Sequence, residues 1–439
     1  MRRRARGLVA VLAVLAPIPA AAQVQDASLE RLLGEAVRSN PDMAAVRARV
    51  RGARAQRFQA ALDLAPTITA SGGYTRQRLS GATFPGLDSV LPDQDVWEAG
   101  IRVSWEVDAF GRVRRTLDGR EALLDAAEEE AHDAALLLAA EVAGTYFELR
   151  SAEERLAVAR SNAENQRRSL AVTEERLEGG RGTALDTERA RAQLSSTLAG
   201  VPALEAAMAA TRHRLAVLLG RDPSDPLAEV EEGAPFPALP EHLAGEDAED
   251  IVARRPDVRA AAHRVEASDA FVGAARTALL PRISLQGAAG YTAATFDALG
   301  NTGTPRYAVG PVVSWPLLDL ARVRSGVDEA QSVRAEARAR HDGAVLTARE
   351  EIETSRVAYA QARTRLGYLE EAAEASERAA ALARLRYEEG AGDFLEVLDA
   401  ERRLLEAEDR LAAGRAEAAA ALVEAYRASG RVVTGEAGS

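Results

Sequence analysis

The chain has 439 residues, no cysteine and a formal net charge of −12 at pH 7. The absence of cysteine excludes disulfides, thiolate metal sites and cysteine nucleophiles. Aromatic residues account for only 4 %, and alanine, glutamate, arginine and leucine dominate, which is typical of long helices or coiled coils. Such an acidic chain is a poor candidate for binding nucleic acid.

The first 22 residues follow the pattern of a secretory signal peptide. A basic start is followed by an apolar run from Leu8 to Leu15 and by small residues that suit cleavage before Gln23. This run is too short to span a bilayer, and Pro17 and Pro19 follow it. No later segment has the run of about 18 apolar residues that a transmembrane helix needs, so we expect an exported chain without one.

One junction motif occurs twice in the chain. WEVDAFGRVR begins at Trp105, and WPLLDLARVR begins 210 residues later, at Trp315. The same offset aligns glycines and arginines downstream, and an offset of 215 aligns Pro41 with Pro256. We therefore expect a first repeat, 23–220, a proline- and acid-rich joining segment, 221–246, a second repeat, 247–430, and a tail, 431–439.

Both repeats predict the same order of elements. A capped helix comes first, followed by two strand-like stretches, a long helix, a glycine turn and a helix that runs back. In the first repeat we expect strands at 67–75 and 96–105, a long helix at 112–178 and a return helix at 185–219. In the second we expect strands at 282–292 and 306–315, a long helix at 322–389 and a return helix at 395–429.

The strand-like stretches alternate between polar and apolar residues. In 96–105, for example, Trp97 and Ile101 lie on one face, and Glu98 and Arg102 lie on the other. Such a stretch of about ten residues fits either a half-buried soluble hairpin or a tilted strand that crosses a bilayer. Four of them in an exported, otherwise helical chain favour the membrane. Because four strands cannot close a barrel and lipid does not tolerate an open edge, we expect three chains to contribute twelve strands.

The long helices carry an apolar residue at every seventh position. Val142, Leu149 and Leu156 show this spacing in the first repeat, and Ile352 and Tyr359 show it in the second. A heptad stripe of this kind predicts a coiled-coil seam.

Several of these motifs resemble those of TolC-like outer-membrane efflux channels. They are RYEEGAGDFLEVLDAERRLLEAE, which begins at Arg386, LEGGRGTALDTERARAQL, the NPD and RPD helix starts, and the WEVDAFGRVR junction. The junction looks most like the OprM-type branch that serves RND pumps. The resemblance implies a mainly helical fold with membrane β-strands: a trimeric α/β-barrel, with a shared outer-membrane β-barrel continued by a long periplasmic coiled-coil α-barrel. Many OprM-type members carry a lipid on an N-terminal cysteine, which this chain lacks, so we expect the barrel alone to attach it.

The resemblance also implies a function and partners. We expect a channel in the outer membrane of a Gram-negative cell, extending into the periplasm, as the passive exit duct of a tripartite efflux system. Its partners would be two further copies, a periplasmic adaptor (membrane fusion protein), an inner-membrane pump of the RND type and outer-membrane lipid. The alternatives are the exit duct of a type I protein secretion system, and a periplasmic coiled-coil adaptor without membrane strands.

By the same resemblance, particular residues have expected roles. The closed periplasmic gate would involve Asp399, Leu395, Glu396, Asp186 and Tyr387, and threefold symmetry would turn each carboxylate into a ring that attracts cations. The adaptor would contact the tips Gly179, Gly180, Arg181, Gly182, Gly390, Ala391 and Gly392. The strand-to-helix junctions would be marked by Trp105, Arg112, Trp315 and Arg322. The alternative is a solvated charge at a helix start for the acids and a plain helix cap for the glycines.

Nothing in the sequence predicts an enzyme. The five histidines are scattered without metal-ligand spacing, and GGRGT follows a helix and lacks the lysine of a phosphate-binding loop. We therefore expect no catalytic residues, no metal, no cofactor and no nucleic-acid partner.

Overall fold

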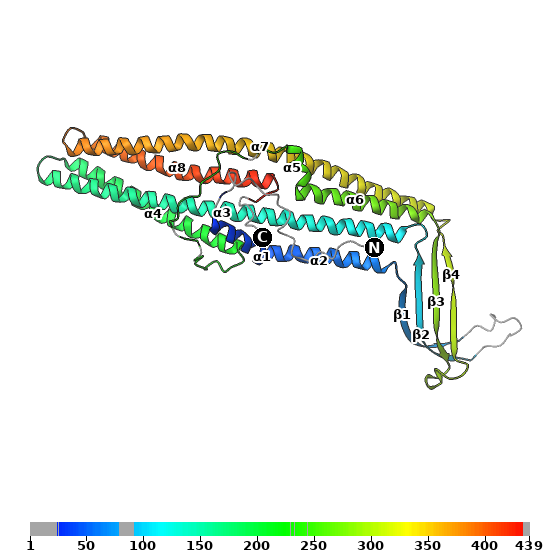
Figure 1. Cartoon of the computed structure of the whole chain (residues 1–439). Helices are drawn as coiled ribbons and strands as arrows, with labels where there is room; N and C mark the ends of the chain where they lie inside the picture. Colours follow the sequence, from blue (N-terminus) through cyan, green and yellow to red (C-terminus); the bar gives the residue numbers. More distant parts are fainter. Residues whose placement is uncertain are drawn as a thin grey trace. The chain divides into compact units, whose positions relative to one another are not determined.

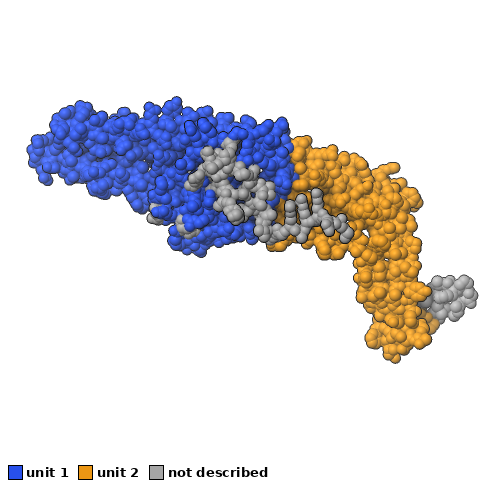
Figure 2. Space-filling model, viewed as in Figure 1, with its two compact units in different colours: residues 1–48, 129–259, 344–439 blue, residues 49–128, 260–343 orange. Residues whose placement is uncertain are grey.

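The computed structural model describes residues 24, 26–78, 92–228, 230–231, 233–243 and 245–432. The expected signal peptide and most of the expected tail lie outside the described residues. The chain divides into two compact units, which are coloured separately in Figure 2. The first unit consists of Met1–Ala48, Glu129–Arg259 and Ala344–Ser439, and the second of Arg49–Glu128 and Ala260–Gly343. Each unit therefore contains segments of both repeats.

The repeats contain the same elements in the same order (Figure 1). The first forms α1 (Ala27–Ser39), α2 (Pro41–Leu62), β1 (Thr67–Gln77), β2 (Gln94–Val107), α3 (Arg112–Glu178) and α4 (Ala184–Leu218). The second forms α5 (Ala248–Arg254), α6 (Pro256–Arg276), β3 (Arg282–Ala293), β4 (Pro305–Ser314), α7 (Leu320–Glu388) and α8 (Phe394–Ala428). Two short 3-10 helices, η4 (Thr277–Leu279) and η5 (Phe296–Ala298), flank β3.

Helices α1 and α5 were not expected from the sequence. Each is separated from the next helix because a proline forces the preceding residue out of the helical region. Asn40 and Arg255, which precede Pro41 and Pro256, are both extended, with ψ of 131°. The proline then opens the next helix, where its missing N–H costs nothing. The other strands and helices end within one or two residues of the expected positions.

The four strands form one antiparallel sheet in the order β1-β2-β3-β4 (Figure 1). One row across the sheet aligns Ile68, Val103, Gly287 and Val309, so the apolar faces of all four strands coincide. This face is open in the chain: Ile68 is 68 % exposed and Val309 is 73 % exposed. Among the described residues, β1 and β4 each pair with one neighbour only, so both edges of the sheet are unpaired there.

Aromatic side chains mark both ends of the sheet. Where β2 and β4 lead into the long helices, the indole Nε1 of Trp105 donates to the carbonyl of Leu64, and that of Trp315 donates to the carbonyl of Leu279. These two contacts occupy equivalent positions in the repeats. Near the opposite ends of the strands, the ring of Trp97 packs against those of Tyr74 and Phe296, with centroids 4.7 and 5.3 Å apart.

In the first unit, helices of both repeats share one hydrophobic core. The heptad residues named from the sequence are all buried: Val142, Leu149, Leu156, Ile352 and Tyr359. The largest cluster combines Leu29 and Leu32 of α1 with residues of α3, α4, α7 and α8. In the described part of the chain, none of the helices combines the length and apolarity needed to cross a membrane.

Candidate functional site

The turns that join the long helices to the return helices have the same geometry in both repeats. Gly180 and Gly390 adopt left-handed backbone conformations, with φ of +68° and +79°. The amide that follows each glycine reaches back five residues along the helix, from Arg181 to the carbonyl of Arg176 and from Ala391 to that of Arg386, at 2.8 Å in both. This pattern is a Schellman helix end, which requires the glycine.

The return helices begin with side-chain caps. The Thr183 hydroxyl accepts from the amide of Asp186 at 3.2 Å and donates to its carboxylate at 2.7 Å. In the second repeat, Asp393 accepts from the amide of Leu395 at 3.1 Å. Asp186 is therefore engaged in the start of α4, and Asp393 caps α8 as Thr183 caps α4.

Tyr387 lies in the hydrophobic cluster next to the two glycine turns, which together form the tip of the long helices. Its ring is 8 % exposed and packs against Phe394, and the guanidinium of Arg176 lies 4.2 Å from the ring centre. Burial raises the pKa of the Tyr387 phenol. Arg176 also donates to the carbonyls of Tyr387 and Glu388, at 2.5 and 3.0 Å. An arginine of the first repeat thus fastens α3 to the end of α7, a contact across 211 residues of sequence.

Leu395, Glu396 and Asp399 lie on the exposed side of α8. Leu395 is 50 % exposed, and the side chains of Glu396 and Asp399 are 49 % and 42 % exposed. Both acids are paired with arginines: Glu396 with Arg386 at 3.3 Å, and Asp399 with two arginines one turn further along α8. The gate residues named from the sequence thus fall into an exposed group on α8 and a turn-stabilising pair, Tyr387 and Asp186.

Buried carboxylates join α8 to the other repeat. Glu401 is 2 % exposed, accepts from the hydroxyl of Ser169 on α3 at 2.8 Å and lies 3.2 Å from Arg384 on α7. Further along, Glu408 accepts from Asn162 on α3 at 2.7 Å. Burial raises the pKa of both carboxyls, although these hydrogen bonds oppose it.

A pocket of about 140 Å³ lies beside the contacts of Glu401 with α3 and α7. Its wall includes Ser169 and Val172 from α3, Arg384 from α7, and Phe394 and Val397 from α8. It is partly open to solvent and lies where α3, α7 and α8 come together near the glycine turns. An apolar cluster around Tyr387 and Phe394 joins the helices there, together with the polar contacts of Glu401 and Arg176.

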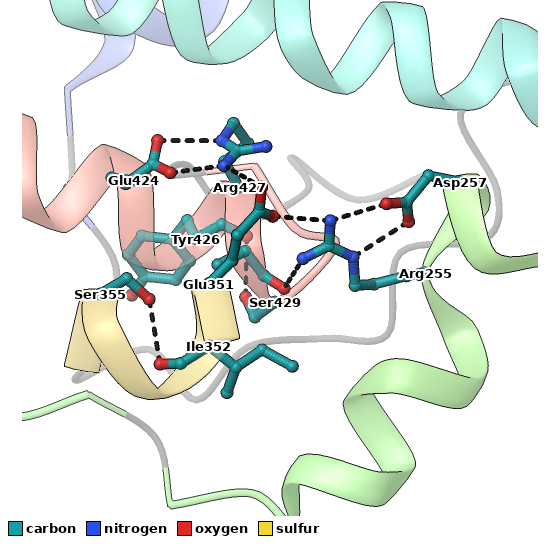
Figure 3. Close-up of polar contacts among 10 residues, drawn as sticks. Arg255, Asp257, Glu351, Ile352, Ser355, Glu424, Tyr426, Arg427 and Ser429 are labelled. Atoms are coloured by element: carbon teal, nitrogen blue, oxygen red, sulfur yellow. Dashed lines mark hydrogen bonds and ion pairs between the residues drawn. The ribbon is translucent and has the colours of Figure 1, made fainter. Parts of the chain in front are cut away.

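A second polar cluster links the ends of the second repeat (Figure 3). Arg255, whose side chain is 5 % exposed, donates to the carbonyl of Ala428 at 3.1 Å and pairs with Asp257 and Glu351, both at 2.7 Å. Glu351 also lies 3.2 Å from Arg427. Burial alone would raise the pKa of Asp257, but the hydrogen bonds from Arg255 hold this pKa below its usual range.

The first repeat makes the equivalent contact with a different residue. Asn40 occupies the position of Arg255, and its amide nitrogen donates to the carbonyl of Leu218 at 2.9 Å. Its side-chain oxygen accepts from the amides of Asp42 and Met43, which caps α2. In both repeats the residue before the proline therefore ties the helix break to the end of the return helix.

The strand-to-helix junctions share their tryptophan contacts but not their ion pairs. Arg112 forms two hydrogen bonds of 2.8 Å with Glu106, whereas Arg322 pairs with Asp319 at 3.0 Å. The difference follows from the sequence, because the second repeat has Pro316 where the first has Glu106. No group of three or more histidines, aspartates or glutamates within the described residues is arranged to hold a metal ion.

The chain matches known proteins along nearly its whole length. The model of the family described as outer membrane efflux protein matches residues 32–221 and 248–431. Outer membrane protein OprJ of Pseudomonas aeruginosa is 31 % identical over 411 residues, which cover 93 % of this chain and 85 % of OprJ. The outer-membrane channel OprN has a similar structure, with a TM-score of 0.85 and 35 % identity over 95 % of this chain and 97 % of OprN.

The outer membrane protein VceC of Vibrio cholerae is also similar, with a TM-score of 0.83 and 25 % identity over 93 % of this chain and 97 % of VceC. These matches confirm the TolC-like, OprM-type resemblance, the outer-membrane location and the efflux function that the sequence predicted. The chain belongs to the outer membrane efflux protein family.

Proposed function

We propose that three copies of the chain form the exit channel of a tripartite efflux system. A periplasmic adaptor and an inner-membrane pump of the RND type deliver substrates to it, and the channel itself is passive. The observation that carries the proposal is the four-stranded sheet with an exposed apolar face and two unpaired edges. In lipid each unpaired backbone group costs several kcal/mol, so β4 of one copy must pair with β1 of the next until the barrel closes.

An exposed apolar stripe on α7 supports association with further copies. Leu346, Val357 and Tyr368 are 66 %, 61 % and 70 % exposed. They are spaced by eleven residues, about three helical turns, and so share one face of the helix. A second copy of the chain is the occupant of this face, because the stripe lies on a long helix of the coiled-coil type.

The two repeats suit this arrangement. We propose that the division into 23–220, a joining segment at 221–246, 247–430 and a tail at 431–439 reflects duplication of one strand-and-helix unit. Each repeat supplies one hairpin of two strands and one pair of long helices. Three chains then present six similar units around one axis.

We propose that the exposed face at the start of α8 forms the closed end of the channel. Leu395 supplies bulk, Glu396 and Asp399 supply charge, and Tyr387 and Asp186 hold the turn in shape. The glycine turns, Gly179–Gly182 and Gly390–Gly392, meet the helical hairpin of the adaptor. Their Schellman geometry gives both turns the same compact backbone.

The alternatives fit less well. A periplasmic adaptor without membrane strands is inconsistent with the four-stranded sheet. An exit duct for type I protein secretion has the same requirements for a barrel, but relatives such as the toluene efflux pump outer membrane protein TtgI of Pseudomonas putida favour a pump.

Planar-bilayer recording of the purified protein tests the proposal, combined with light scattering of the same sample. A trimer that produces discrete conductance steps supports the channel. A monodisperse monomer with a stable β-sheet signal contradicts it.

A further inference from the structure

We propose that Arg402 and Arg403 set the ion selectivity of the closed end, because they neutralise the carboxylate of Asp399. This inference rests on the proposed function, in which the start of α8 faces the pore. An acidic ring alone would attract cations. The structure places an arginine pair beside that ring, and the pair converts it into a charge-compensated constriction.

Each oxygen of the Asp399 carboxylate has its own arginine. Arg402 donates from Nη2 to Oδ1 at 3.2 Å, and Nε of Arg403 lies 3.0 Å from Oδ2. The two arginines follow Asp399 by three and four residues, so all three side chains lie on one face of α8. Arg402 and Arg403 are 60 % and 71 % exposed, so their charges reach the same solvent as the carboxylate.

The other acid of this face is also compensated. Glu396 lies one turn before Asp399 and pairs with Arg386 of α7 at 3.3 Å. The carboxylates of Glu396 and Asp399 are therefore paired with three guanidinium groups. Positive charge at least balances negative charge there.

The separations make this compensation effective. The screening length at physiological ionic strength is about 8 Å, so charges 3 Å apart cancel each other's field before solvent ions can screen them. With three copies, two arginines would accompany every Asp399 carboxylate around the pore. A permeating cation would meet no net attraction at Asp399, and an anionic substrate would meet no net repulsion.

The test is the ratio of potassium to chloride permeability, measured from reversal potentials of the full-length protein in a planar bilayer. The variant is Arg402→Gln with Arg403→Gln. The matched control is Arg410→Gln, because Arg410 also lies exposed on α8 and pairs with Glu406 at 3.6 Å. Exposed ion pairs contribute little to stability, so assembly is retained in both. Recordings in a Leu395→Ala background give larger currents without changing the charge.

We expect the wild type and the control to show no preference for potassium over chloride. The double variant should favour potassium several-fold and should be blocked by magnesium from the periplasmic side. Adding Asp399→Asn to the double variant should abolish both effects. An unchanged permeability ratio in a conducting double variant overturns the inference and leaves the channel intact. The absence of conductance in the wild type overturns the proposed function itself.

Discussion

Single residues on the strands occupy one of two environments, and their tolerance of charge should differ accordingly. Val103 lies on the apolar face, where its Cβ approaches Gly287, whereas Gln286 lies on the polar face opposite Ser104. If the apolar face meets lipid, Val103→Arg should cost about 2–4 kcal/mol near the bilayer midplane. Gln286→Arg should be tolerated. Folded yield in outer-membrane fractions, with urea unfolding, measures both, and equal tolerance would remove the membrane assignment.

Arg176 connects α3 to the end of α7 beside the glycine turns. Arg176→Met removes two hydrogen bonds to backbone carbonyls and the contact with the Tyr387 ring. We expect the free energy of unfolding to fall by about 1–3 kcal/mol and the resting conductance to rise. Arg191→Met is the control, since Arg191 lies near the same turn and forms only exposed ion pairs, with Glu174 and Glu188. Equal conductance in both variants would show that this contact does not hold the tip closed.

Part of the charge pairing at the start of α8 could be predicted from the sequence. Arg402 and Arg403 follow Asp399 at the spacing of helical neighbours, so their pairing needs only a helix. The expectation of a cation-attracting ring considered the acids alone. Arg386 approaches Glu396 across the turn between α7 and α8, which only the structure decides.

At the level of elements, α8 is held to α3 and α7 by a buried carboxyl whose titration should be measurable. Burial raises the pKa of Glu401 above its ordinary 4.5, partly offset by Ser169 and Arg384. A carboxyl with a raised folded-state pKa stabilises the fold fully below the unfolded value, and this contribution is lost as pH rises through the folded value.

The expected result is a pH-dependent difference between the wild type and Glu401→Gln. The glutamine mimics the protonated form and keeps an oxygen for Ser169. Relative to the variant, the wild type should lose stability as pH rises from about 4.5 through the folded-state pKa. Thermal unfolding across this range checks the prediction. Parallel curves for the two proteins would mean that Glu401 does not titrate differently on folding.

The helix break before Pro41 is stabilised by Asn40, which caps α2 and donates to the Leu218 carbonyl. Asn40→Ala removes the cap of α2 and the donor to Leu218, and should lower the free energy of unfolding by about 1–2 kcal/mol. Asn40→Asp keeps the capping oxygen but loses the donor and sets an acceptor against the Leu218 carbonyl, so comparing the two variants separates the cap from the donor. Chemical denaturation of the three proteins compares them. An Asn40→Ala protein as stable as the wild type would show that the proline alone defines the break.

For the whole molecule, association should depend on the exposed stripe of α7. Val357→Glu places a carboxylate at the centre of the stripe, between Leu346 and Tyr368. Burying that charge at an interface without a partner is costly, so the trimer should dissociate in mild detergent at concentrations where the wild type remains assembled. Light scattering after size-exclusion chromatography gives the mass. A variant that stays trimeric would place the interface on another face of the helix.

The sequence by itself determined everything that depends on local periodicity. Alternation of period two predicted the strands, the seven-residue spacing predicted the long helices, and Gly180 and Gly390 predicted the turns, because each pattern reflects the geometry of the backbone within a few residues. The repeated order of elements was predicted for the same reason. The helix breaks before Pro41 and Pro256, which separate α1 and α5 from the helices that follow, were the local feature that the sequence did not predict.

Only the tertiary structure decided which distant groups meet. The ring of Tyr387 meets the guanidinium of Arg176, 211 residues away, and the Ser169 hydroxyl meets Glu401, 232 residues away. Arg255 reaches the end of α8, where the first repeat uses Asn40 for the same purpose. These pairings depend on the way in which the long helices pack side by side. Their register is set by the packing of the whole seam and not by any single stretch of sequence, because helix neighbours in space are separated by a full helix length along the chain.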